Sequence, residues 1–382
     1  PKNRSKYKNR KEIKKYKDKK EKKYKKEIKI NKATEDIIYL EEKEEPVQIQ
    51  KDINIGIQIL RMIYCFLVVV VHFGKADRAL YDFSWVYIDF YVTSFFLISF
   101  YFSYNTFSSR YIPKIKERFL RLLFPYILWP ILIYIRHNFE NIKNIQISQY
   151  ILKRFYIQYL LGNNIHGILW FLFNLILISL FICIIIFMFK DYHMYALYIV
   201  FILVTIYNYT KIHNKFMDSF NCSPIQHSLE IINETIIFSI TGYILASFDI
   251  LNRLVKLNKY IFLFFAPIFY IVKWHQEVFD LLPRFNVVFN DFFISSIFIF
   301  FGTLPFHVCK NSFINKIIKI ISRHTGGIYY LHTECYDILI NRYNLWSHGT
   351  FGCCMFVYFA TYIFCDIFSR IFKNWRLRYL FN

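Results

Sequence analysis

Cysteine, glycine and proline are all scarce in this sequence, and their scarcity excludes several classes of protein. The 382 residues contain eight cysteines, ten glycines and nine prolines. No CxxC pair and no His-rich spacing accompanies the cysteines, so neither a disulfide framework nor a zinc site is indicated, and we expect no metal. Ten glycines are too few for a collagen-like chain. Most cysteines lie in apolar runs, where a thiol packs as a small hydrophobic group.

Charge is scarce outside the N-terminal segment. Residues 1–51 hold 19 of the 48 Lys and Arg residues and 10 of the 27 Asp and Glu residues. The remainder is therefore more apolar than the overall hydrophobic content of 55% suggests. Its apolar runs include residues 62–71 and 171–189, and the second is long enough to cross a hydrocarbon core of about 30 Å as a helix. This distribution favours a membrane protein over a soluble domain with a single core.

The same distribution divides the chain into three parts. Residues 1–50 are predicted to be a disordered, Lys-rich cytoplasmic tail, because they are too polar to bury a core. Residues 51–370 are predicted to form the transmembrane domain, and residues 371–382 a basic cytoplasmic C-terminal tail. A basic tail can bind anionic lipid or nucleic acid, but we interpret this one as solvated and expect no nucleic-acid partner. A lysine tract precedes the first apolar run, which we interpret as a retained anchor rather than a cleaved signal.

Apolar stretches of roughly 17–22 residues recur from residue 55 onward and predict an all-α, polytopic bundle of about ten spans. The predicted spans are 55–73, 84–104, 119–136, 168–188, 192–210, 229–249, 260–274, 290–308, 325–341 and 350–369. With the N-terminal tail inside, the other inner segments carry 17 Lys and Arg residues and the outer ones 11. This bias predicts that both termini are cytoplasmic and that the sequon Asn208-Tyr209-Thr210 lies outside.

Two ionisable residues stand in the first span, where hydrocarbon should exclude them unless they face a cavity or a partner. Arg61 and His72 are 11 positions apart, which at ~100° per residue is about three turns plus ~20°. They share a helical face and lie about 16 Å apart along it. This arrangement suits a long ligand with an anionic part and a reactive part. The alternative is an arginine at the inner headgroups and a histidine at the outer interface.

Further polar residues stand near or within other spans. Arg118 and Arg121 are three positions apart and point the same way from the start of a helix, where guanidinium groups suit phosphate. Anchoring of the loop at the inner headgroups is the alternative. Residues 166–172 open the fourth span with a histidine, and residues 326–334 place His332 and Glu334 inside the ninth. A separation of two is unfavourable for direct contact along one helix, which weakens a His332–Glu334 dyad.

Taken together and in this order, these residues resemble the acyltransferase-3 family of multispanning membrane O-acyltransferases. The Arg-x10-His pattern in that family's opening span is matched by Arg61 and His72. Its FF-x-x-SG stretch is similar to residues 95–101, with Ser99 at the serine. Phe100 replaces the glycine there and fills the space that a glycine leaves free.

Two further segments extend the resemblance over about residues 55–370. The Arg-x-x-Arg element with a following proline is matched by Arg118, Arg121 and Pro125. A Trp-Phe-Leu stretch at 170–172 accompanies a terminal TLGIYLLH-like segment, which is similar to residues 325–332.

The resemblance implies a multi-pass integral membrane enzyme that moves an acyl group, commonly acetyl, from acetyl-CoA or another acyl-CoA to a hydroxyl group. The implied acceptors are cell-surface carbohydrates, with some lipids and other small molecules. His72 is then the expected general base, because an imidazole with an ordinary pKa near 6.5 can accept a proton at neutral pH. His332 is a second candidate for acid–base work or acceptor binding. Membrane lipid is an expected partner, and the oligomeric state stays open.

The donor is expected to bind through cationic and hydroxyl groups. Arg61 would hold acidic parts of the donor or the developing oxyanion. Arg118 and Arg121 would receive coenzyme A phosphates from the cytoplasm, with Ser99 nearby in the donor site.

Two other classes of protein fit the same sequence. A transporter or exporter also lines its pathway with charged residues inside spans, but no convincing similarity between the two halves indicates inverted repeats. A non-catalytic scaffold would present its basic tail to anionic lipid and would tolerate loss of Arg61 and His72.

Overall fold

The computed structural model divides the chain into two units, Pro1–Ile53 and Asn54–Asn382. The structure describes residues 54–79, 81, 88–137, 170–209, 223–254, 260–265, 267–268, 286–304, 313–373 and 376–381, all of them in the second unit. The predicted tail 1–50, residues 168–169 of the fourth predicted span, the preceding residues 166–167 and Thr210 of the sequon lie outside these residues.

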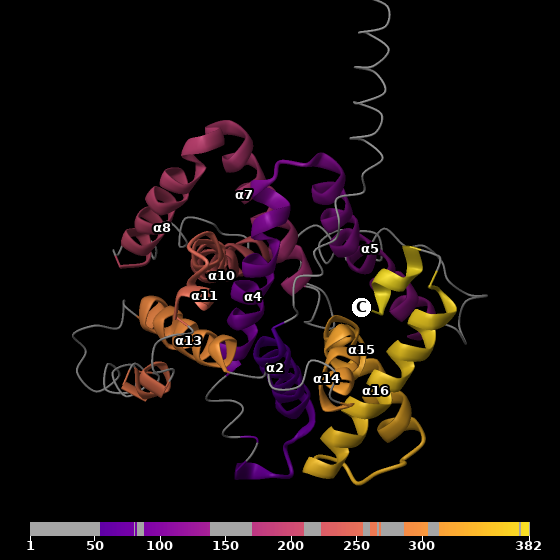
Figure 1. Cartoon of the computed structure of the whole chain (residues 1–382). Coiled ribbons are helices and arrows are strands. Elements are labelled where there is room, and N and C mark those ends of the chain that lie inside the picture. Colours follow the sequence, from indigo (N-terminus) through magenta and orange to yellow (C-terminus); the bar gives the residue numbers. More distant parts are fainter. Residues whose placement is uncertain are drawn as a thin grey trace, which may run out of the picture. The chain divides into compact units, whose positions relative to one another are not determined.

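The described residues form helices joined by turns, and no strand occurs among them, which confirms the all-α class (Figure 1). The long helices are α2 (Ile55–Phe73), α4 (Ile88–Ser108), α5 (Ile112–His137), α7 (Trp170–Phe189), α8 (His193–Tyr209), α10 (Ser223–Ser247), α13 (Asn286–Thr303), α15 (Thr325–Tyr336) and α16 (Phe351–Ile371). Shorter elements are the 3₁₀ helices η2 (Lys190–Tyr192) and η5 (Arg376–Leu380), the π-helix η4 (Asp337–Arg342), and the α-helices α11 (Ile250–Leu254) and α14 (Phe313–Arg323).

Three described helical segments are long and apolar enough to cross a membrane: Ile55–Phe73, Trp170–Tyr207 and Phe351–Ile371. The second has 38 residues, but η2 interrupts it. Lys190 has a φ of 47°, in the left-handed region that side chains rarely adopt, and the chain turns sharply there between α7 and α8 (Figure 1). The remaining spans of the predicted ten stay a prediction.

Glycines set the closest helix contacts around α2 and α4. A Cβ added at Gly242 on α10 would collide with the carbonyl oxygen of Leu97 on α4, so α4 and α10 pack with their backbones in contact. Gly56 similarly admits the carbonyl oxygen of Phe301, near the end of α13, against the start of α2. Asn54 caps α2 by accepting from Ile57 N at 3.1 Å. The contacts of Gly56 and Asn54 fix the start of the helix that carries Arg61 and His72.

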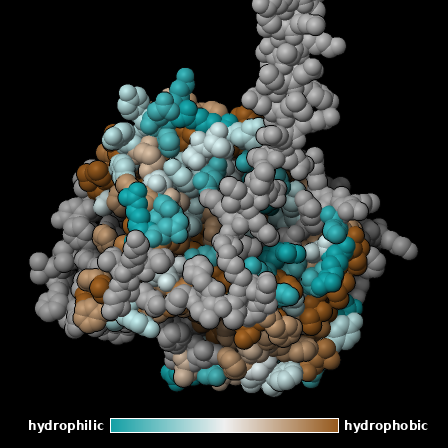
Figure 2. Space-filling model, viewed as in Figure 1, coloured by the Kyte–Doolittle hydropathy of each residue, from teal (hydrophilic) through white to brown (hydrophobic). Residues whose placement is uncertain are grey.

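Helix α16 divides cleanly into two faces. Its cysteines are buried, as expected for thiols that pack as small hydrophobic groups. The opposite face exposes an apolar stripe at spacings of four: Phe359, Ile363, Ile367 and Ile371. Figure 2 shows hydrophobic surface on the side where Figure 1 places α16. An exposed apolar stripe on a helix of membrane-spanning length is suited to contact with lipid.

Candidate functional site

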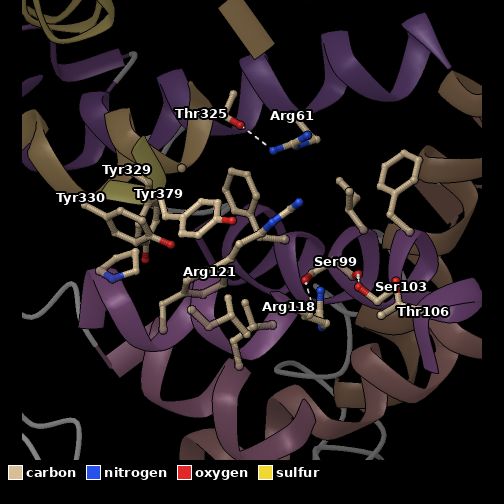
Figure 3. Close-up of a pocket in the computed structure, with 18 of the residues that line it drawn as sticks. Arg61, Ser99, Ser103, Thr106, Arg118, Arg121, Thr325, Tyr329, Tyr330 and Tyr379 are labelled. Carbon is tan, nitrogen blue, oxygen red and sulfur yellow. Dashed lines mark hydrogen bonds between the residues drawn. The ribbon is translucent and has the colours of Figure 1, made fainter. Parts of the chain in front are cut away.

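A cavity of about 550 Å³ lies among α2, α4, α5, α7, α15 and η5. Figure 3 shows Arg61 on one side of this cavity and Arg118 with Ser99 on the other. The structure brings together here four residues predicted from the sequence: Arg61, Ser99, Arg118 and Arg121.

Arg61 reaches the cavity from the second turn of α2. Its Nη2 donates to Thr325 Oγ1, at the start of α15, at 2.7 Å. Its Nη1 donates to Gln58 Oε1 at 3.2 Å, because residues three apart share a helical face. Both partners are uncharged, so they fix the guanidinium in place and leave its charge uncompensated.

Arg118 enters the cavity from α5 and bonds to hydroxyl groups. Its Nη2 lies 3.2 Å from Ser99 Oγ on α4 and 3.4 Å from Ser179 Oγ on α7. Ser99 is therefore a partner of the arginine as well as a lining residue. This guanidinium joins three helices around one positive charge.

Phe100 has a distinct role in this arrangement. Its ring centroid lies 5.3 Å from the guanidinium carbon of Arg118, and that of Phe107 lies 5.1 Å from the same atom. Such contacts are cation–π interactions. The residue that departs from the family's glycine therefore helps to form an aromatic support for Arg118.

Arg121 lies at the exposed mouth of the cavity, next to one acidic and one aromatic residue. It pairs with Glu117 one helical turn away, and its guanidinium carbon lies 5.7 Å from the ring centroid of Tyr379 on η5. Tyr379 Oη donates to Glu117 Oε1 at 3.4 Å. Glu117 therefore balances part of the charge of Arg121.

Positive charge dominates the lining. Lys114 joins the three arginines, and Glu117 is the carboxylate that faces them among the described lining residues. No described carboxylate lies within ion-pair distance of Arg61 or Arg118. A cation in a helical membrane domain costs several kcal/mol unless an anion, water or a partner compensates it. The charged part of the lining therefore suits an anionic ligand, and guanidinium forks suit phosphate in particular.

The rest of the lining is mostly apolar. Phe95 and Ile98 from α4 face Phe171 and Leu175 from α7. Sites for cofactors and small molecules commonly combine such walls with a few polar groups that orient the ligand. The cavity can therefore accommodate an amphipathic ligand with an anionic end and a long, less polar part.

His72 and His332 lie outside the lining and face each other. Their ring centroids are 5.1 Å apart, and the rings are inclined at 47°. His72 is exposed in the last turn of α2, whereas His332 is fully buried on α15. Nδ1 of His332 lies 3.1 Å from Ile328 O, and a carbonyl oxygen only accepts, so Nδ1 carries the proton. Nε2 then holds the lone pair, and it has no hydrogen-bond partner among the described residues.

Helices α2 and α15 run parallel, because their contacts keep the same order along both. Arg61 meets Thr325 near the two helix starts, and His72 meets His332 further along. Tyr329 belongs to both places, because it lines the cavity while its ring centroid lies 6.3 Å from that of His332. The cavity therefore ends at Tyr329, one aromatic side chain short of the imidazoles.

Glu334 has a partner other than His332. Its Oε2 lies 2.7 Å from Nη2 of Arg136, and the same nitrogen lies 2.8 Å from Asp337 Oδ2. The ion pair joins α5 to α15 and η4. A direct His332–Glu334 dyad is not formed, as the spacing of two residues already indicated.

Sequence reasoning missed several residues of the cavity. Thr325 and Tyr329 stand in the recognised 325–332 segment, and their spacing of four places both on one face. Tyr379 had no such signal, because it reaches the cavity only through tertiary packing of η5. The segment 376–381 was assigned to a C-terminal tail, yet Leu380 and Phe381 are buried.

The membrane-length apolar helices are typical of an integral membrane protein, and the arginine-rich cavity is suited to an anionic ligand. A family model described as an acyltransferase domain matches residues 54–376. The chain therefore belongs to the acyltransferase-3 family, which confirms the resemblance and places it among the membrane acyltransferases. No curated protein and no solved structure matched the chain.

Proposed function

We propose that the protein transfers an acyl group, with acetyl as the first candidate, from an acyl-CoA to a hydroxyl group of a carbohydrate or another cell-surface acceptor. The observation that carries this proposal is the pair of guanidinium groups, Arg61 and Arg118, facing one cavity. Their partners are hydroxyl and amide oxygens, and neither pairs with a described carboxylate. An acyl-CoA has phosphates that can compensate the charge of these guanidinium groups. It also has a long, less polar arm that matches the apolar part of the lining.

In this proposal the donor lies along the cavity with its phosphates at the start of α5. Lys114, Arg118 and Arg121 all line that part of the cavity. Guanidinium groups bind phosphate through two parallel hydrogen bonds, whereas lysine acts as a point charge. The pantetheine arm then runs along the apolar wall that includes Phe95 and Phe171, toward Tyr329. The expected cytoplasmic position of this helix start would give the donor direct access from inside.

For the reacting end of the donor to lie beside His72, the ring of Tyr329, where the cavity ends, must move aside. The acceptor oxygen attacks the thioester carbonyl carbon as His72 takes the hydroxyl proton, which is general base catalysis. A C–O bond forms and the C–S bond breaks. The coenzyme A thiolate leaves and regains a proton from the imidazolium, so the products are an ester and a free thiol. His72 is exposed, so an acceptor can reach it from outside the bundle.

The test is transfer of label from radiolabelled acetyl-CoA to acceptors in membranes that contain the protein. His72→Ala should lower transfer by about 10²–10⁴-fold, the usual contribution of a general base, without loss of membrane insertion. His193→Gln is the matched control, because that imidazole bonds to Lys190 O and Tyr243 Oη and lines no part of the cavity. Transfer retained by His72→Ala excludes His72 as the base. Uptake of label without a covalent product favours transport instead.

A further inference from the structure

The segment 376–381 packs firmly against the helical domain. Leu380 and Phe381 are 3% and 4% exposed and join a cluster with Trp129 and Leu331. Burying two such side chains is favourable at about 25 cal/mol per Å² of apolar surface. The segment η5 is therefore part of the folded domain.

Three contacts anchor its backbone as well. Trp129 Nε1 donates to Leu380 O at 3.2 Å, and His324 Nδ1 lies 2.9 Å from Phe381 O. A Cβ added at Gly327 would lie only 2.7 Å from the same carbonyl oxygen, so α15 and the segment touch directly. These anchors belong to α5 and to the start of α15, the two places that also carry Arg121 and the Thr325 partner of Arg61.

The anchored segment presents Tyr379 to the cavity. Tyr379 lines it, places its ring beneath the guanidinium of Arg121 and donates its hydroxyl to Glu117. Figure 3 shows Tyr379, Tyr329 and Tyr330 among the side chains that line the cavity. Glu117 is itself the ion-pair partner of Arg121. One tyrosine therefore contacts both members of the pair that forms the cavity mouth.

We infer that η5 is a wall of the donor site and that Tyr379 is a positioning residue, which holds Arg121 and Glu117 for the phosphate-bearing end of the donor. The family match ends at residue 376, so Tyr379 lies beyond the matched residues. The inference rests on the proposed donor. Trp129 holds this segment but does not line the cavity, so a substitution of Trp129 should weaken donor binding through the segment alone.

The test measures binding of coenzyme A to the purified full chain, together with the kinetics of acyl transfer. Tyr379→Ala should weaken coenzyme A binding and raise the donor KM by about three- to tenfold, the range for loss of one partly exposed cation–π contact. The kcat and the acceptor KM should not change. Tyr379→Phe keeps the ring and loses the hydroxyl, so it should show a smaller rise. Trp129→Phe removes the hydrogen bond to Leu380 O and should also raise the donor KM, as Tyr379→Ala does.

The control is Tyr195→Ala, which removes an exposed tyrosine on α8 that lines no part of the cavity. It should leave every constant unchanged. If the unaltered protein binds coenzyme A and Tyr379→Ala binds it equally well, the inference is overturned while the proposed donor stands. If the unaltered protein binds no coenzyme A, the proposed donor fails and the role of Tyr379 toward it fails with it. A fall in kcat alone would also contradict a role confined to the donor.

Discussion

The imidazoles of His72 and His332 lie with their ring centroids 5.1 Å apart, although they come from the first and the ninth predicted span. One ring is exposed and the other is fully buried. The buried ring has a proton fixed on Nδ1 by Ile328 O, which leaves the lone pair on Nε2. The contact therefore places a ring with a nitrogen unpartnered among the described residues against His72, the proposed general base.

The first prediction concerns this pair. His332→Gln should lower kcat for acyl transfer by about tenfold or more, toward the lower end of the general-base range, because the buried lone pair beside His72 is lost. Both KM values should stay within about twofold of the unaltered protein, since His332 does not line the cavity. Initial rates over a range of donor concentrations measure both. An unchanged kcat would leave His332 with a structural role alone.

The second prediction concerns Arg118. Arg118→Lys should raise the donor KM by about tenfold, because an ammonium group cannot reproduce a guanidinium fork that reaches Ser99 and Ser179 and stacks on aromatic rings. Arg110→Lys is the matched control, since its guanidinium pairs with Asp191 away from the cavity. Equal donor KM values in the two variants would show that Arg118 does not bind the donor.

The third prediction concerns Phe100, which stands where the family has glycine. Phe100→Ala should destabilise the fold by about 3–5 kcal/mol, because it removes a fully buried ring. Phe100→Leu keeps most of the buried volume and loses the contact with Arg118. This second variant should melt near the temperature of the unaltered protein but raise the donor KM by a few fold. Thermal unfolding in detergent and donor titration together separate the two effects.

The fourth prediction concerns the contact between α4 and α10. Gly242→Ala should destabilise the protein by about 1–3 kcal/mol, the usual cost of overpacking, because the new methyl group meets the rigid carbonyl of Leu97. Gly352→Ala serves as the comparison, because its Cβ would lie 3.1 Å from the exposed ring of Trp346, which can move aside. Thermal unfolding of both variants tests this difference. Equal stability would mean that α4 and α10 adjust their separation freely.

Helical periodicity explains how far the sequence could predict the site. Arg61 and His72 were placed on one face by their spacing alone, and both contact α15 in the structure. Arg118 and Arg121 were grouped by the same reasoning, and both line the cavity. Local geometry of this kind depends on a few intervening residues, so the sequence carries it directly.

Long-range packing was beyond the reach of periodicity. Tyr379 meets Glu117 through a fold that brings η5 against α5, and no local pattern at residue 379 indicates this. The aromatic support of Arg118 is a similar case, because Phe100 looked only like a departure from a glycine. The distance that separates the cavity from His72 also depends on how α15 packs, so the sequence predicted a shared face but not the intervening Tyr329.

The left-handed turn at Lys190 has a consequence for the sidedness of the whole chain. If the apolar stretch of 38 residues crossed the membrane only once, every later helix would cross it in the opposite direction. In the predicted set of spans, α15 would then oppose α2, yet the pairing of Arg61 with Thr325 and of His72 with His332 requires the two to be codirectional. In the predicted set, a turn at Lys190 keeps α2 and α15 pointing the same way. A reporter tag inserted at residues 105–111 and another at residues 250–254 should then map to the same compartment.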